Sequence, residues 1–169
     1  MLGGVEKFLS SEEVQLLNQS LVSLTLPPTV SCESRYTIAF RLVHEGAIYY
    51  SAKYKRVKSR NSYTIVFKDV CDTTAYGQIQ FFVLVSNSVF AYVKKFEPLA
   101  VSCQAHFHLS HQSLDILSAS NIVPVKSDGE IDVFIPASSL VSKCIFVSIT
   151  DSSNSCNYII SFPNKLLYD

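Results

Sequence analysis

The chain has 169 residues, and its 14 acidic and 14 basic side chains give a formal net charge of zero, which excludes a global attraction to nucleic acid or acidic lipid. Hydrophobic residues make up 48% of the sequence, which argues against wholesale disorder. The length suits one domain and is short for two, so we predict a single domain over residues 1–169. Because only 17% of residues are charged, we expect another domain or a partner to cover part of the surface.

Five scattered cysteines without a C-x-x-C pair indicate reduced, mostly buried thiols in a nuclear or cytoplasmic protein. They are Cys32, Cys71, Cys103, Cys144 and Cys156. The first ten residues lack an uninterrupted apolar segment after a basic start, so we expect no secretory signal. The apolar run F-F-V-L-V is far shorter than the roughly 20 residues of a membrane helix. We therefore predict an intracellular protein with no membrane partner.

The first predicted element is a helix over about residues 10–24. Ser10 and Glu13 have the spacing of a capping box, in which the two side chains satisfy backbone donors at the helix start. Apolar residues at helical spacing then predict one inward face. They are Val14, Leu17 and Leu21, with Leu16 beside them. The sequence T-L-P-P at 25–28 ends the helix, because proline lacks a backbone donor and restricts the preceding residue.

The next segment predicts two antiparallel strands. Residues 34–43 alternate apolar and polar side chains, which is the period of a half-buried strand. H-E-G at 44–46 predicts a tight turn, and I-Y-Y at 48–50 begins the return strand. Residues 53–60, called the basic ribbon below, follow this hairpin and lead into the next strand.

Three β-rich runs after the basic ribbon predict a meander of consecutive strands. The strands are expected at 63–67, 79–85 and 89–96, and a short hairpin connection at 86–88 joins the last two. Gly77 lies at the head of the second strand, where a missing side chain tolerates a bulge or a close approach of another backbone.

The last third is also predicted to be β-rich. Further strands are expected at 106–109, 123–125, 131–135, 144–149 and 158–162. S-D-G at 127–129 predicts a hairpin, and P-A-S-S-L at 136–140 predicts a single helical turn. Together, about eight to ten short strands predict an all-β, mainly antiparallel and barrel-like core over about residues 34–162, with one N-terminal helix.

The basic ribbon is the first candidate site. Its cations are interleaved with tyrosines: Lys53, Lys55, Arg56, Lys58 and Arg60, with Tyr50, Tyr54 and Tyr63. Phosphates attract cations, and single-stranded bases stack on aromatic rings. An edge strand that is protected from aggregation by lysines has a similar composition. The pattern therefore allows a nucleic-acid contact, an acidic protein partner or a protected edge strand.

The second candidate is the pattern C-x-x-H-x-H-x-x-H, formed by Cys103, His106, His108 and His111. On a strand His106 and His108 would share a face, as zinc-binding imidazoles can. The paired ligand spacing of a structural finger is missing, and no carboxylate lies within the cluster to orient the imidazoles. We therefore predict surface histidines and no metal or other cofactor, with zinc as the alternative.

No catalytic constellation is evident in the sequence, which lacks both G-x-S-x-G and a glycine-rich phosphate loop. Asp69 and Asp72 near the basic ribbon could hold a divalent ion, but a solvated loop is the favoured interpretation. An aromatic cage for a methylated lysine competes with ordinary use of tyrosine in a core. The tyrosines in question are Tyr36, Tyr49, Tyr54, Tyr63, Tyr76 and Tyr92. We predict a protein without enzymatic activity or a small-molecule substrate.

Five segments carry a family resemblance: Y-Y-S-A-K-Y-K-R-V-K-S-R-N-S-Y, Y-G-Q-I-Q-F-F, F-A-Y-V-K-K-F, V-S-K-C-I-F-V-S-I and F-P-N-K-L-L-Y-D. Through them nearly the whole chain resembles the C-terminal domain of CACTA-like, transposon-encoded proteins of animals. The resemblance implies an accessory to a transposase-type protein, whose catalytic carboxylates would lie outside this segment. At the level of fold alone, the meander is also similar to chromatin-reader barrels such as the bromo-adjacent homology domain.

These observations predict a non-catalytic binding module that contacts nucleic acid or an acidic chromatin partner. The predicted contact residues are Lys53, Tyr54, Lys55, Arg56, Lys58, Arg60 and Tyr63. The alternative is a structural module that docks on an upstream transposase-type domain through its charge-poor surface. Salt separates these hypotheses, because binding to phosphates weakens steeply with salt and apolar docking does not.

Overall fold

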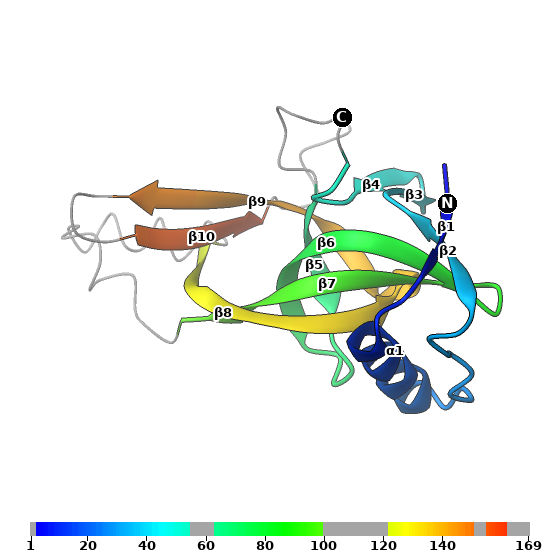
Figure 1. Ribbon diagram of the computed structural model, residues 1–169. Coiled ribbons are helices and arrows are strands. Elements are labelled where there is room, and N and C mark those ends of the chain that lie inside the picture. The colour runs from blue at the N-terminus through cyan, green and yellow to red at the C-terminus, as the bar shows by residue number, and fades with distance from the viewer. Residues whose placement is uncertain (1–2, 55–62, 100–121, 151–154, 162–169) are drawn as a thin grey trace, which may run out of the picture.

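The computed structural model describes residues 3–54, 63–99, 122–150 and 155–161, without the side chains of 127–129 and 155–156. The elements are β1 (Val5–Phe8), α1 (Ser11–Ser23), β2 (Arg35–Ala39), β3 (Arg41–His44), β4 (Ala47–Tyr50), β5 (Thr64–Lys68), β6 (Thr74–Val85), β7 (Ser88–Pro98), β8 (Ile122–Pro136), the 3₁₀ turn η1 (Ala137–Ser139), β9 (Leu140–Thr150) and β10 (Ser155–Ser161). All strand pairings between these elements are antiparallel. The predicted mainly antiparallel β fold with an N-terminal helix is confirmed (Figure 1).

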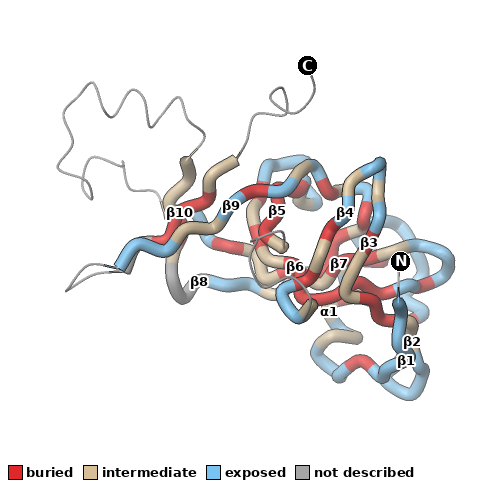
Figure 2. The backbone as a smooth tube through the Cα atoms, turned by 90° about the horizontal axis from the view of Figure 1, so that it is seen from above, coloured by how far each residue is buried: buried red, intermediate tan, exposed pale blue. Residues whose placement is uncertain are grey.

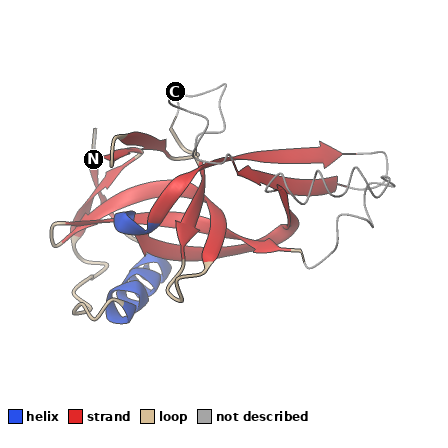
Figure 3. Cartoon of the chain, turned by 180° about the vertical axis from the view of Figure 1, so that it is seen from behind, coloured by secondary structure: helices blue, strands red, loops and turns tan. Residues whose placement is uncertain are grey.

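The main sheet curls into a partial ring. Its strand order is β1-β2-β6-β5-β9-β10-β8-β7, and β7 also pairs with β6. The ring is not a strict barrel. Only one part of β8 pairs with β7 and only one part of β9 pairs with β5, and the other part of each strand pairs with β10. Parts of β8 and β9 pair with β10 and extend away from the body with it, as Figures 1 and 3 show. This extension, residues 122–125, 144–150 and 155–161, is called the arm below.

Helix α1 begins as the sequence predicts. The Ser10 N–H donates to Glu13 Oε2 at 2.8 Å, and the Glu13 N–H donates to Ser10 Oγ at 3.1 Å, which completes the capping box. Leu17 and Leu21 are buried against the outer face of the sheet, and the helix ends at Ser23. The helix therefore supports the sheet from one side (Figure 1).

Strands β6 and β7 contribute to two hydrophobic clusters, one inside the ring and one between α1 and the sheet. Figure 2 shows buried residues along both strands. Ile79 and Phe82 both belong to the interior cluster, although alternation would place them on opposite faces. The pairing explains this: Ile79 lies opposite Val93 and Phe81 opposite Tyr92, so Gln80 is an extra residue. This β-bulge lets Phe81 turn toward the helix-side cluster.

Gly77 fills the role expected of it. A Cβ atom at this position would lie 2.5 Å from Val93 Cγ1 and 2.6 Å from the Lys94 carbonyl oxygen on β7. A real Cβ does not approach a backbone atom so closely, so β6 and β7 can come together only because residue 77 has no side chain.

The short turns also agree with the sequence. Glu45 and Gly46 both have positive φ, 47° and 76°, and join β3 to β4 as a two-residue hairpin turn. Ser86 and Asn87 join β6 to β7 in the same way, with φ of 47° and 66°. The turn predicted in P-A-S-S-L is present as η1, and the strands predicted at 144–149 and 158–162 are present within β9 and β10, except for residue 162, which lies outside the described residues.

Two predicted strand assignments are wrong. Residues 34–43 do not form one strand, because the chain leaves the main sheet at Phe40 and β3 pairs only with β4 among the described elements. S-D-G at 127–129 does not form a hairpin, since β8 runs continuously through it. β8 pairs with β10 before this point and with β7 after it, so the chain bends between two partners instead of folding back on itself.

The cysteine prediction is only partly correct. Cys144 is buried, and burial raises the pKa of its thiol to about 12. Cys32 and Cys71 are exposed, which contradicts mostly buried thiols among the cysteines whose side chains are described. All three are free thiols.

Candidate nucleic-acid interface

Both ends of the segment that contains the basic ribbon are fixed to one residue of β6. The Ala52 N–H donates to the Ile79 carbonyl at 2.7 Å, and the Ile79 N–H donates to the Tyr63 carbonyl at 2.9 Å. Residues 52 and 63, on the two sides of this segment, are therefore fixed at the same point of β6. Four predicted contact residues lie outside the described residues: Lys55, Arg56, Lys58 and Arg60.

Lys53 and Tyr54 are the described residues at the start of the basic ribbon. The Tyr54 N–H donates to the Ser51 carbonyl at 3.1 Å, so Lys53 lies in a tight turn and not in the extended strand that an edge-strand interpretation requires. The exposed Lys53 ammonium is 5.9 Å from the centre of the Phe81 ring. This turn directs the chain away from β4 as the ribbon begins.

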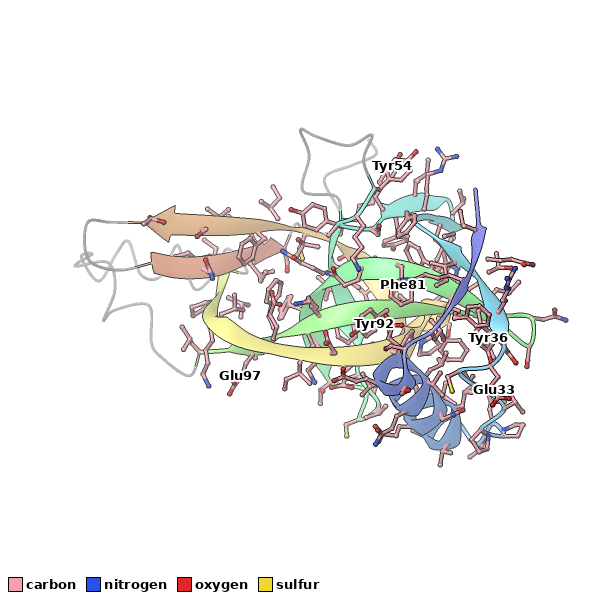
Figure 4. All side chains as sticks on the ribbon, viewed as in Figure 1. Glu33, Tyr36, Tyr54, Phe81, Tyr92 and Glu97 are labelled. Carbon is pink, nitrogen blue, oxygen red and sulfur yellow. The ribbon has the colours of Figure 1, made fainter. Side chains whose placement is uncertain are left out.

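Two tyrosines and an arginine lie beside this turn. The rings of Tyr50 and Tyr54 are 5.2 Å apart at 36°, and both side chains are half-buried; Figure 4 shows Tyr54 near β4, at the edge of the body. Arg41 lies directly opposite Tyr50 in the β3–β4 hairpin. The sequence analysis missed Arg41, although counting back from the H-E-G turn places residue 41 opposite residue 50. Tyr63 is half-buried at the other end of the segment.

Four lysines on other parts of the described surface pair with carboxylates, whereas Lys7, Arg35 and Lys143 form no ion pair there. The ammonium–carboxylate pairs are Lys68–Asp72 at 3.8 Å, Lys94–Glu130 at 2.7 Å, Lys126–Glu97 at 2.6 Å, and Lys95–Asp69. Lys53 and Arg41 form no ion pair with a carboxylate of the described residues. Within the described chain, the cations at the base of the ribbon are therefore available to a partner, and the paired lysines are not.

The pKa values follow the ion pairs. The hydrogen bond to Glu130, and then its charge, raise the pKa of Lys94. Burial favours the neutral form of Asp69, but hydrogen bonds from Lys95 and from a backbone amide outweigh it, so the pKa of Asp69 is lowered.

The other predicted sites gain no support from the described residues. Asp69 and Asp72 bind lysines, and the described part of the chain contains no group of three or more His, Cys, Asp or Glu residues arranged to hold a metal ion. Cys103, His106, His108 and His111 lie outside the described residues. Four of the six tyrosines proposed for a cage pack with three different clusters: Tyr49 inside the ring, Tyr36 and Tyr92 beneath α1, and Tyr76 near the arm.

Comparisons with known proteins give no relative: no family model, curated protein or solved structure matches the chain. Across the described residues, no helix has the length and apolar character required to cross a bilayer. The function must therefore be argued from the base of the basic ribbon and its charges.

Proposed function

We propose that this protein is a non-catalytic binding module that contacts nucleic acid through the basic ribbon. The observation that carries the proposal is the double attachment to Ile79, whose N–H and carbonyl bind the two ends of the segment. The attachment fixes the base of a segment with five cations, while Arg41 adds a sixth nearby. Because the chain has no net charge, such a local group of cations would be its main attraction for phosphates.

Tyrosines near the ribbon favour single strands over duplexes as the ligand. Unpaired bases can stack on exposed aromatic faces, and each such contact contributes about 1–3 kcal/mol. Tyr50 and Tyr54 are half-buried and lie next to the cations, where a strand bound by its phosphates could reach them. A duplex would offer the same phosphates but keep its bases paired.

The proposal is tested by fluorescence anisotropy with a labelled single-stranded oligonucleotide, measured from low to physiological salt. The triple variant Lys55→Gln, Arg56→Gln, Lys58→Gln should bind at least about tenfold more weakly at low salt. The slope of log K against log salt should become shallower by about 2, because each lost phosphate contact removes about 0.7. The melting temperature should stay unchanged.

A matched control removes the same charge elsewhere. The variant Lys7→Gln, Lys126→Gln, Lys143→Gln changes lysines on β1, β8 and β9 and should bind nearly as tightly as the unmodified protein. Equal losses in both triple variants would mean that only net charge matters. The proposal is also wrong if the unmodified protein binds no oligonucleotide at low salt.

A second candidate function is docking on a protein domain, as the resemblance to transposase-associated proteins suggests. Two exposed side chains on one face of β9 favour it: Ile145 and Ile149 are 36% and 49% exposed. Because strand residues alternate between faces, these two positions, four residues apart, lie on the same side. Binding through this face would change little with salt or in the ribbon variant. Binding through the ribbon would weaken in both cases.

A further inference from the structure

A cavity of about 470 Å³ lies between α1, the β5–β6 loop and the end of β8. Its walls are largely apolar: Leu16 comes from α1 and Leu24 from the residue after it, Val70 comes from the loop, and Ile135 and Pro136 come from β8. A volume of this size is typical of sites for small organic ligands.

One carboxylate in this cavity lacks a full set of partners. Asp132 lines the cavity, and its Oδ1 is buried without a hydrogen-bond partner in the structure. The residue opposite it on β7 is Lys94, which would be the natural partner. The Lys94 ammonium instead binds Glu130 at 2.7 Å. A buried carboxylate without a full set of donors is unfavourable, so a cation brought into the cavity beside Asp132 would be attracted by its charge.

The remaining charged residues of the cavity also leave it negative. Three aspartates and one lysine line it, and that lysine, Lys68, pairs with Asp72 at 3.8 Å. Asp69 pairs with Lys95. These pairs leave Asp132 as the lining carboxylate that forms no ion pair with a lysine or arginine of the described residues, although its charge also interacts with Lys94 on β7.

Tyr92 contacts Asp132 but cannot neutralise it. Burial, and then a hydrogen bond and the charge of Asp132, raise the pKa of Tyr92, so the phenol stays protonated and uncharged at neutral pH. Tyr92 lies on β7 and packs in the cluster between α1 and the sheet. In the view of Figure 4 its label lies just above the helix. Tyr92 therefore adds no charge of its own at this end of the cavity.

We propose that this cavity binds a small organic cation: an alkyl chain ending in an ammonium or guanidinium group. The charged group is held by the negative charge of the Asp132 carboxylate, and the alkyl chain lies against the apolar walls. A metal ion fits less well, because one carboxylate surrounded by aliphatic side chains does not supply the several oxygen ligands that hard cations require. This ligand is separate from the nucleic acid proposed above and was not predicted from the sequence.

The test is an NMR titration of the full chain with butylguanidinium and butylammonium as probes, against butanol and butyrate. Both cations should bind saturably and shift the amides of 16–24 and 132–136, with Kd of about 1 mM, as expected for ligands of this size. Butanol and butyrate should bind at least about tenfold more weakly. Equal binding of butanol, or no saturable shift with either cation, would overturn the proposal.

Two variants test the site itself. Asp132→Asn should weaken binding of both cations at least about tenfold, whereas Glu97→Gln, which removes a carboxylate paired with Lys126, should leave it unchanged. Ser23→Phe, an exposed lining position on α1, should fill the cavity and abolish binding with every charge intact. If Asp132→Asn does not fold, the binding measured with Ser23→Phe tests the site by itself. Retained affinity in Ser23→Phe contradicts the site.

A capped Gly-Arg-Gly tripeptide distinguishes a free cation from a protein side chain. It carries the same guanidinium on a peptide backbone and should bind no more tightly than butylguanidinium. Clearly tighter binding of the tripeptide would overturn the assignment to a small molecule and identify a peptide as the ligand.

Discussion

Gly77 and Gln80 show how much single residues decide in this sheet. Gly77 allows β7 to approach β6, since a Cβ there would lie 2.6 Å from the Lys94 carbonyl oxygen. Its role could be predicted because a glycine in a strand often marks a bulge or a close approach of another backbone, although Gly77 lies inside β6 and not at its head as predicted. The bulge at Gln80 could not be predicted, because it depends on the register between β6 and β7 and not on the identity of that residue.

Cys144 predicts how stability depends on pH. Burial raises its pKa to about 12 in the native state, whereas an unfolded thiol has a pKa of about 8.5. Between these values the unfolded chain has lost the proton and the native chain keeps it, so the free energy of unfolding falls as pH rises. The contribution is complete below about pH 8.5 and disappears as pH approaches 12.

The measurement is urea unfolding at several pH values above 8. Cys144→Ala should be less stable at neutral pH, because it leaves a small cavity, but its stability should fall less steeply with pH. The matched control is Cys71→Ala, at an exposed thiol, which should keep the slope of the unmodified protein. A slope in Cys144→Ala as steep as that of the unmodified protein would contradict the assignment.

The β6–β7 hairpin predicts a stabilising change. Ser86 and Asn87 both have positive φ, a conformation that Asn-Gly adopts more easily than Ser-Asn. The double variant Ser86→Asn, Asn87→Gly should therefore raise the free energy of unfolding by about 0.5–1 kcal/mol. Urea unfolding measures the difference.

The β3–β4 turn provides the control of opposite sign. Gly46 has a φ of 76°, so Gly46→Ala should lower the free energy of unfolding by about 1 kcal/mol. If the β6–β7 variant is also less stable, its turn residues are fixed by contacts outside the turn, and the local explanation fails.

Elements defined by local chemistry were predictable, and those defined by distant partners were not. The capping box, the two-residue turns and η1 depend on adjacent residues, and they match the sequence. S-D-G at 127–129 has the composition of a hairpin turn, yet β8 continues through it because β10 and β7 hold its two halves. Likewise the break at Phe40 arises where β2 pairs with β6 and β3 with β4.

The arm is predicted to open more readily than the body. One link between them is the stacked pair Phe96 and Phe146, whose rings are 5.2 Å apart at 10°. Phe146→Ala should therefore speed hydrogen exchange of amides in β10 by about tenfold or more, with little change in β6 and β7. Native-state hydrogen exchange measures this directly.

A control variant at another exposed aromatic position separates a local effect from a general one. Phe8→Ala removes a ring on β1 that Arg35 covers, and it should leave exchange in β10 unchanged. If both variants speed exchange throughout the sheet, the arm and the body open as one unit.

The candidate interface was predicted only in part. The composition of the basic ribbon is visible in the sequence, but the state of each cation is not. Lys95 and Asp69 are 26 residues apart, and Lys94 and Glu130 are 36 apart, so their pairing requires the folded sheet. Arg41 joins the candidate site because a hairpin places it opposite Tyr50.

The hydrogen bonds of Ala52 and Tyr63 with Ile79 have a consequence for how the sequence between those two residues can evolve. The distance between those two residues is set by β6 and does not depend on how many residues lie between them. Doubling the number of residues between two fixed points of a chain costs only about 0.6 kcal/mol. Insertions and substitutions can therefore accumulate there at little cost in stability, so binding specificity can diversify while the sheet that carries it is preserved.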